Sequence, residues 1–114
     1  MKSHLCAVFL SLLCLSSLTQ AENRLFIKYR PTTVDVDTKA FEYLNTSKSS
    51  FVGGAWYDKS KSYMIINLSS INFQYCGVDE GTWKTFKASG SFGTGYQRLF
   101  KGHFDCRIIP PPEY

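Results

Sequence analysis

The chain has 114 residues, of which 44% are hydrophobic, 16% aromatic and 19% charged, and its formal net charge is +4. This length fits a single domain of about 100–200 residues, and the apolar content is sufficient for a core and too high for a disordered tail. A transporter, a two-domain enzyme and a coiled coil are therefore excluded, and so mild a positive charge does not by itself imply a polyanionic partner.

The N-terminus has the pattern of a secretory signal peptide. Lys2 precedes an apolar run over residues 5–18, and Ala21 provides a small residue at the expected cleavage point. The run is shorter than the roughly 20 residues that a membrane-crossing helix needs, and lipoprotein processing at Cys14 is disfavoured by the bulky leucine before it. Removing residues 1–21 would leave 93 residues with a net charge of +3. We therefore predict a secreted or periplasmic protein with no membrane span.

Two cysteines, Cys76 and Cys106, remain beyond the predicted signal peptide. In a small exported domain such a pair most often forms a disulfide. Closing a loop of about 30 residues would stabilise the fold by roughly 3–4 kcal/mol in the chain-entropy model. The alternative is a pair of free, buried thiols.

Residues 22–48 predict an N-terminal extension of loops and short strands. The stretch 25–29 is apolar enough for a short strand, and Pro31 limits its length. Residues 34–37 alternate between apolar and acidic, and residues 40–44 fit either one more strand or a single helical turn. The polar stretch that follows is expected to be a loop.

The middle of the chain predicts a β-meander. Residues 51–57 form a strand whose two glycines permit a bulge, and residues 58–61 form a turn. Residues 62–68 are β-branched and aromatic, with Tyr63 and Ile65 on the face opposite Met64 and Ile66. After a short turn, residues 71–76 alternate strictly. Three antiparallel strands with tight connections are therefore expected.

The second half of the chain changes to a helical period. Asp79 can cap a helix that carries Trp83 and Phe86 and ends near residues 88–90. Beyond a Gly/Ser-rich break, apolar residues at helical spacing predict a second helix with one apolar stripe: Phe92, Tyr96, Leu99, Phe100 and Phe104. Residues 108–109 could form a short strand, and a Pro-rich tail, residues 110–114, ends the fold.

The predicted fold is α+β: a small antiparallel β-meander of three to five strands with two C-terminal helices packed on one face. With helices on one face only, the other face of the sheet is expected to stay partly exposed. Exposed aromatic side chains there would be suitable anchors for a partner.

Residues 49–109 resemble the KTSC domain, a small module named for its occurrence at the carboxy-terminus of some lysyl-tRNA synthetases. The resemblance is carried by the order and spacing of short motifs: Ser49-Ser50, Tyr57-Asp58, Phe73-Gln74-Tyr75, Gly77-Val78, Trp83, Phe86, Ala88, Ser91-Phe92-Gly93, Tyr96, Phe100-Lys101-Gly102 and Phe104. It implies a domain proposed to bind RNA by association with tRNA synthetases.

The chain departs from the family pattern at several points. Phe73 stands where the family usually has tyrosine, and the family's Val-Pro turn is Val78-Asp79. The cysteine pair and the predicted signal peptide are further additions, and both suit export. Because cellular RNA is scarce outside the cytoplasm, an exported copy weakens the implication of RNA binding.

His103 is the sole histidine after residue 21, and the sequence offers it no clear catalytic partner. One histidine and two distant cysteines do not make a usual zinc set, so we predict no metal and no cofactor. A Cys76–His103 pair would need a free thiol, and a Ser–His–Asp arrangement with Asp105 lacks a nucleophile motif. A small secreted nuclease that pairs His103 with Glu80 or Glu42 remains the enzymatic alternative. The simpler interpretation is a surface residue on the polar face of the last helix, so we predict that the chain is not an enzyme.

Nucleic-acid binding has modest support in the residues themselves. Basic residues lie one turn apart on each predicted helix, Lys84 with Lys87 and Arg98 with Lys101, and could contact phosphates. Aromatic residues on the predicted sheet could stack on bases: Tyr63, Phe73 and Tyr75. The competing interpretation is that the lysines are solvated and the aromatics form the core.

We therefore predict a small, exported, non-enzymatic binding module, expected to be monomeric, with RNA or DNA or another protein as its partner. As a protein-binding molecule it would be an inhibitor or an immunity protein. Asn45 and Asn67 lie in glycosylation sequons, a motif that recurs often by chance and matters only in a eukaryotic secretory pathway.

Overall fold

The computed structural model describes residues 23–114, so the predicted signal peptide of residues 1–21 lies outside the described residues. A two-stranded sheet pairs β1 (Arg24–Leu25) with β2 (Val34–Asp35). A four-stranded antiparallel sheet has the order β3-β4-β5-β6, with the strands at Glu42–Leu44, Val52–Asp58, Tyr63–Leu68 and Ile71–Cys76. A 3₁₀ turn, η1 (Lys59–Lys61), follows β4, and two helices follow β6: α2 (Glu80–Lys87) and α3 (Phe92–Leu99).

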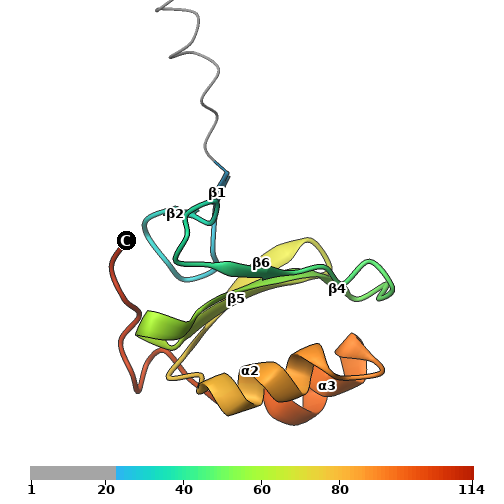
Figure 1. The fold of residues 1–114 in the computed structure, drawn as a ribbon. Coiled ribbons are helices and arrows are strands. Elements are labelled where there is room, and N and C mark those ends of the chain that lie inside the picture. Colours follow the sequence, from blue (N-terminus) through green and yellow to red (C-terminus); the bar gives the residue numbers. More distant parts are fainter. Residues whose placement is uncertain (1–22) are drawn as a thin grey trace, which may run out of the picture.

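The α+β prediction is confirmed: both helices cover one face of the four-stranded sheet (Figure 1). Neither helix in the described part of the chain has the length and apolarity needed to cross a bilayer.

Local sequence explains how the strands connect. Asp58 ends β4 and accepts hydrogen bonds from the backbone amides of Ser60 and Lys61, so it caps η1. Ser69 and Ser70 both have positive φ, 49° and 73°, which is the conformation of the tightest hairpin turns and lets β5 return directly as β6.

A bulge in β4 explains why two glycines stand within a strand. The pairing with β5 shifts between Val52 and Ala55, and Gly54 has a φ of +118° that a larger residue would rarely adopt. The extra residue places both Val52 and Ala55 in the core beneath the helices. The predicted bulge is therefore confirmed.

The helix starts follow the capping rules. The Asp79 side chain accepts a hydrogen bond from the Thr82 amide at the start of α2, and Ser91 accepts one from the Thr94 amide at the start of α3. Trp83 and Phe86 from α2 are then buried against the sheet, as predicted.

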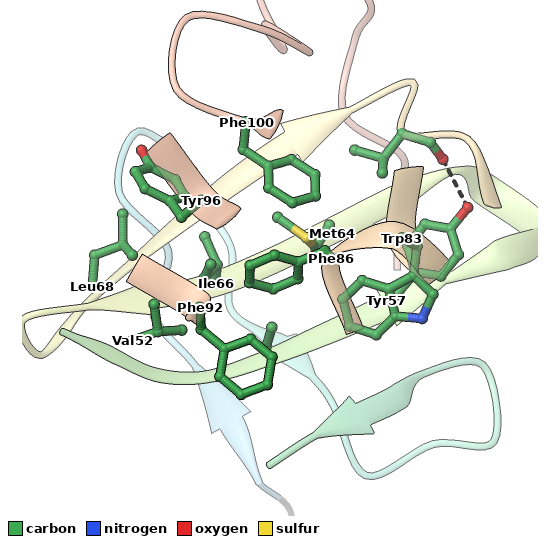
Figure 2. Close-up of a cluster of buried hydrophobic side chains, with 12 residues drawn as sticks. Val52, Tyr57, Met64, Ile66, Leu68, Trp83, Phe86, Phe92, Tyr96 and Phe100 are labelled. Atoms are coloured by element: carbon green, nitrogen blue, oxygen red, sulfur yellow. Dashed lines mark hydrogen bonds between the residues drawn. The ribbon is translucent and has the colours of Figure 1, made fainter. Parts of the chain in front are cut away.

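The core between helices and sheet is built mainly from aromatic and branched side chains (Figure 2). Tyr57 stacks on Trp83 with ring centroids 5.0 Å apart and donates a hydrogen bond of 2.7 Å to the Val78 carbonyl. Phe86 meets Phe100 edge to face at 5.1 Å. These contacts fix α2 and α3 over Met64 and Ile66 of β5.

The second face of the sheet is exposed only in part, as expected: Tyr43 of β3, whose ring lies 5.4 Å from that of Trp56, is 56% exposed, and much of the rest of this face is covered. A second buried cluster lies there, formed by Tyr63 and Ile65 from β5 and by N-terminal residues that include Ile27, Val34 and Val36. The C-terminal tail adds Tyr114, whose ring lies 5.6 Å from that of Tyr63. The N-terminal extension and the C-terminal tail therefore pack on this face of the sheet (Figure 1).

The second helix is shorter than its apolar stripe predicts. It ends at Leu99, and Gly102 and Phe104 have positive φ values of 80° and 56°, so the stripe continues through a loop. Residues 108–109 lie in a turn rather than in the expected strand. This loop brings residues 102–107 to the edge of β6.

Candidate functional site

The outer edge of β6 is one part of the sheet that the fold leaves partly open. At one end the Asn72 carbonyl accepts a hydrogen bond of 2.8 Å from the Lys28 amide, and at the other the Cys76 amide donates one of 2.9 Å to the Phe104 carbonyl. The backbone amide and carbonyl groups of successive residues point to opposite sides of a strand. The backbone groups of residues 72, 74 and 76 therefore all point away from β5. The amide and carbonyl of Gln74 therefore face outward between the two covered positions, and among residues 23–114 neither has a hydrogen-bond partner.

A groove of about 810 Å³ runs along this edge. Its floor is formed by Phe73, Gln74 and Tyr75, one wall by Lys28 and Tyr29, and the other by residues 102–107. The volume lies in the range of small-ligand and short-peptide sites, about 300–1,000 Å³. We call this hollow the β6-edge groove.

Apolar side chains stand exposed around the β6-edge groove. Tyr29 is 87% exposed and is held at a φ of +67°, an unfavourable conformation for a tyrosine. Phe26 and Ile108, close in sequence to the two walls, are 83% and 80% exposed. Of these three residues Tyr29 lines the groove, and a large exposed aromatic side chain beside an open strand edge is typical of an interaction surface.

The walls of the groove carry more positive than negative charge. The Lys28 ammonium lies 5.2 Å from the centre of the Tyr29 ring and 5.5 Å from that of Phe73. Across the groove, the Arg107 guanidinium holds the Asp105 carboxylate through both oxygens, and its hydrogen bonds keep the pKa of Asp105 below the ordinary 3.8. The charges of Arg107 and Asp105 cancel, so the ammonium of Lys28 makes the net charge of the groove walls positive.

His103 lies in the wall of this groove and not on a helix, which corrects its predicted position on the polar face of the last helix. It is exposed, and within the described residues its imidazole contacts no carboxylate. Its neighbour Asp105 is engaged by Arg107 instead. Glu42 and Glu80 are bound to lysines elsewhere, so neither is paired with His103.

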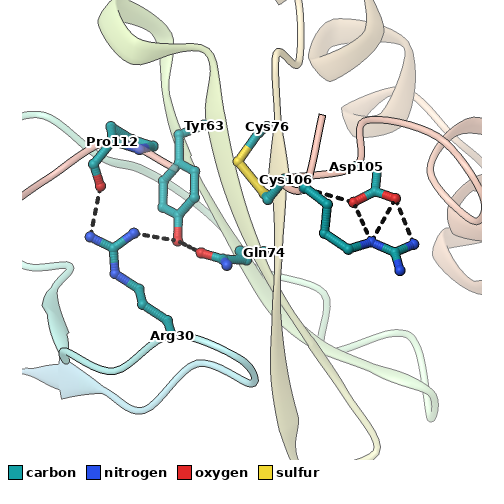
Figure 3. The surroundings of a disulfide bond; sticks show 8 residues. Arg30, Tyr63, Gln74, Cys76, Asp105, Cys106 and Pro112 are labelled. Carbon is teal, nitrogen blue, oxygen red and sulfur yellow. Dashed lines mark hydrogen bonds and ion pairs between the residues drawn. A yellow bond between two sulfur atoms is a disulfide. The ribbon is translucent and has the colours of Figure 1, made fainter. Parts of the chain in front are cut away.

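Cys76 and Cys106 form the predicted disulfide (Figure 3). The bond joins the end of β6 to the loop that forms one wall of the groove, and both cysteines pack against the second core cluster. The position of residues 102–107 relative to the Gln74 backbone is therefore fixed covalently. A Cys76–His103 nucleophile pair is ruled out in this oxidised state.

Tyr63 was predicted as an exposed stacking residue, and the structure contradicts this. It is fully buried, lies on the face away from the helices, and donates a hydrogen bond to Gln74 while accepting one from Arg30 (Figure 3). Burial raises the pKa of Tyr63 to about 12, and the nearby Arg30 lowers it only in part. Its ring is covered by Tyr114 and is not available to a ligand.

Phe73 and Tyr75 lie on the helix side of the sheet, so the structure does not bring them together with Tyr63. Both are partly buried and both reach the floor of the β6-edge groove. Burial raises the pKa of Tyr75, and its hydrogen bond with Tyr96 raises it further. Of the three predicted aromatic residues, these two alone contribute to the groove.

The predicted basic residues divide into two pairs. On α2, Lys84 contacts Glu80 at 3.3 Å and Lys87 contacts Glu42 at 2.7 Å, so their charges are largely compensated. Arg98 and Lys101, at the end of α3, are exposed and make no ion pair with any described residue. A continuous basic face across both helices is therefore absent from residues 23–114.

The two serine motifs of the KTSC resemblance meet in a second, smaller hollow of about 280 Å³ that Lys48 also lines. Ser49 accepts hydrogen bonds from the amides of Phe51 and Val52, and Ser91 caps α3. Both side chains thus have structural roles, the first in starting β4 and the second in starting α3.

Sequence reasoning missed the groove because its walls come from segments with no regular pattern. Lys28 and Tyr29 belong to the irregular N-terminal part, and the helical spacing of Phe100 and Phe104 hid the loop between them. One signal could have found it: a Cys76–Cys106 bridge necessarily places His103 and its neighbours beside β6. Within residues 23–114, no group of three or more potential metal ligands comes together.

Comparisons of this chain with protein-family models, with curated proteins and with solved structures return no match. The resemblance to the KTSC domain therefore stays a prediction that rests on the order and spacing of the motifs in the chain.

Proposed function

We propose that this chain is an exported, non-enzymatic binding module whose ligand site is the β6-edge groove. The observation that carries the proposal is the coincidence at one place of an unpaired backbone position, Gln74, with exposed aromatic and basic side chains. Such a combination offers main-chain hydrogen bonds, apolar contact and charge to one ligand. The disulfide and the predicted signal peptide support export.

Two features support a role without catalysis. General acid–base cleavage commonly uses two titrating groups that both reach the substrate, and the carboxylate nearest His103 in sequence is engaged by Arg107. His103 is exposed in the groove wall, and its imidazole contacts no carboxylate of residues 23–114. The test is hydrolysis of single-stranded RNA by the chain and by His103→Ala. No turnover by either protein is expected, and RNA cleavage that His103→Ala abolishes would overturn the non-enzymatic proposal.

The location of the site is tested by a fragment screen followed by NMR. A library of a few hundred soluble fragments is added to the oxidised, isotope-labelled chain, and shifts of backbone amides are mapped. Binding fragments are expected to shift Lys28, Tyr29, Gln74 and residues 102–107. Hits that cluster elsewhere, or an absence of hits at these amides, would contradict the assignment of the groove.

Nucleic acid, the partner implied by the resemblance, is a second candidate ligand supported by Arg98 and Lys101. They are the two predicted phosphate contacts whose charge is not compensated by a described carboxylate. If they contact phosphates, the Arg98→Ala/Lys101→Ala variant should lose oligonucleotide affinity and lower the salt dependence, while Lys84→Ala/Lys87→Ala should change little. Equal effects of the two variants, or no oligonucleotide binding at low salt, would remove this candidate.

A further inference from the structure

We propose that the β6-edge groove takes a short, extended, acidic segment of a protein partner, which adds to the sheet as one more strand beside Gln74. This inference rests on the proposed function and names the class of ligand. Three features of the groove support it: the outward backbone groups of Gln74, the shape of the walls, and the positive charge of Lys28.

The backbone requirement comes from Gln74. An edge residue with both its amide and its carbonyl facing outward forms two hydrogen bonds with an antiparallel neighbour, and this is how peptides are added to open sheet edges. The orientation of Gln74 follows from its neighbours two positions away on the strand. The Asn72 carbonyl faces outward to the Lys28 amide, and the Cys76 amide faces outward to the Phe104 carbonyl. A nucleic acid carries no backbone that could complete this pattern of donor and acceptor.

The shape of the walls favours a single extended strand over a second copy of this sheet. Lys28 covers the edge at Asn72 and Phe104 covers it at Cys76. Three residues of β6 lie between these two positions, which are about 13 Å apart along the strand. The edge of another folded sheet could not enter this gap, whereas three or four residues of an extended peptide fit it. The aromatic floor at Phe73 and Tyr75 then provides contact for alternate side chains of the peptide.

The charge of the walls selects for acidic residues. The Lys28 ammonium stands over the rings of Tyr29 and Phe73 at the mouth of the groove, and Arg107 and Asp105 neutralise each other on the opposite wall. An aspartate or glutamate of the peptide can therefore pair with Lys28, while a basic side chain at the same place would be repelled.

The proposal is tested by selecting random octapeptides on phage against the oxidised chain recovered after export of the 114-residue precursor. Enriched peptides are expected to alternate acidic with apolar or β-branched residues. A parallel selection against Lys28→Glu should lose this preference and enrich basic residues instead. Enrichment without acidic residues, or the same acidic sequences on Lys28→Glu, would contradict the charge argument.

A matched pair of variants tests the strand addition. Gln74→Pro removes the outward amide and leaves the pairing with β5 intact, because edge positions of this kind tolerate proline. Gln74→Ala keeps the amide and loses the same hydrogen bond to Tyr63, so it controls for any effect on the fold. An enriched peptide should bind Gln74→Pro about tenfold more weakly than Gln74→Ala. Equal affinities would show that the peptide does not pair with the strand, and the proposal would be abandoned.

Hydrogen exchange gives a readout that does not depend on substitution. The Gln74 amide should exchange more slowly when an enriched peptide is bound, since it becomes a hydrogen-bond donor. If no peptide is enriched but a single-stranded oligonucleotide shifts the groove amides, the ligand class is wrong and the groove still binds. If neither probe nor any fragment shifts those amides, the proposed function fails together with the inference.

Discussion

At the scale of single residues, Asp58 shows how one buried carboxylate organises both faces of the sheet. It is fully buried at the end of β4 and accepts hydrogen bonds from Ser60, Lys61 and Tyr114. Burial by itself raises the pKa of Asp58, but these hydrogen bonds outweigh it, so the pKa lies below the ordinary 3.8. The charged form is therefore the one that the fold stabilises.

The pH dependence of Asp58 follows from the sign of this shift. A carboxylate with a lowered pKa contributes its stability above the unfolded value, about 3.8, and loses it as the pH falls through the lower folded value. We expect Asp58→Asn to cost about 1–2 kcal/mol at pH 7 and to flatten the loss of stability below pH 4. Urea unfolding at several pH values measures this. Asp37→Asn, an exposed position, is the control, and identical acid profiles for all three proteins would contradict the prediction.

At the scale of elements, the disulfide is the connection with the largest expected energetic effect. It closes a loop of 30 residues between β6 and the loop after α3. In the chain-entropy model, replacing both cysteines in Cys76→Ser/Cys106→Ser should lower the free energy of unfolding by about 3–4 kcal/mol. Urea denaturation of the double variant, compared with the oxidised and the reduced chain, tests this. A reduced chain as stable as the oxidised one would contradict it.

The C-terminal tail is an element that periodicity could not predict. Arg30 donates to the Pro112 carbonyl at 2.7 Å, and Tyr114 packs 5.1 Å from Phe41 and donates to Asp58 at 2.8 Å. These contacts come from isolated residues in irregular chain, so no spacing rule reveals them. The meander, α2 and the disulfide were predictable because alternation, a capping aspartate and cysteine pairing are local signals, whereas the groove depends on segments far apart in sequence.

Removal of the tail tests its role through Tyr63. Deleting residues 110–114 should let water reach the Tyr63 ring and lower its pKa from about 12 toward the ordinary 10. Loss of the Tyr114 contacts should also cost about 1–3 kcal/mol of stability. NMR titration of ring-labelled tyrosine and urea unfolding measure the two effects.

The intact chain provides the reference for this titration. Because the raised pKa favours the neutral phenol, the stability that Tyr63 contributes should be lost as the pH rises from about 10 through 12. Glu113→Ala keeps the backbone carbonyl that Lys61 contacts and should behave as the unmodified chain. An unchanged Tyr63 titration after the deletion would show that the tail does not shield the ring.

At the scale of the whole molecule, the sheet joins two hydrophobic clusters into three layers. Ile65 and Ile66 are neighbours in β5, yet the first belongs to the cluster beneath the N-terminal segment and the second to the cluster beneath the helices. Each tryptophan reports on one layer: Trp83 lies in the helix cluster, and Trp56 packs against the other. Because β4 and β5 contribute to both clusters, neither layer keeps its packing surface if the other unfolds.

This arrangement predicts a single cooperative transition. In Trp56→Phe and Trp83→Phe, the remaining tryptophan should report the same urea midpoint as far-UV circular dichroism of the same variant. Adding Ile65→Val to either variant should lower the free energy of unfolding by about 0.5–1.5 kcal/mol, whether fluorescence or circular dichroism is measured. Ile66→Val, in the cluster on the opposite face, should have the same effect. An earlier transition at Trp56 than at Trp83 would instead mean that the N-terminal layer, with the Lys28 wall of the groove, opens independently of the helices.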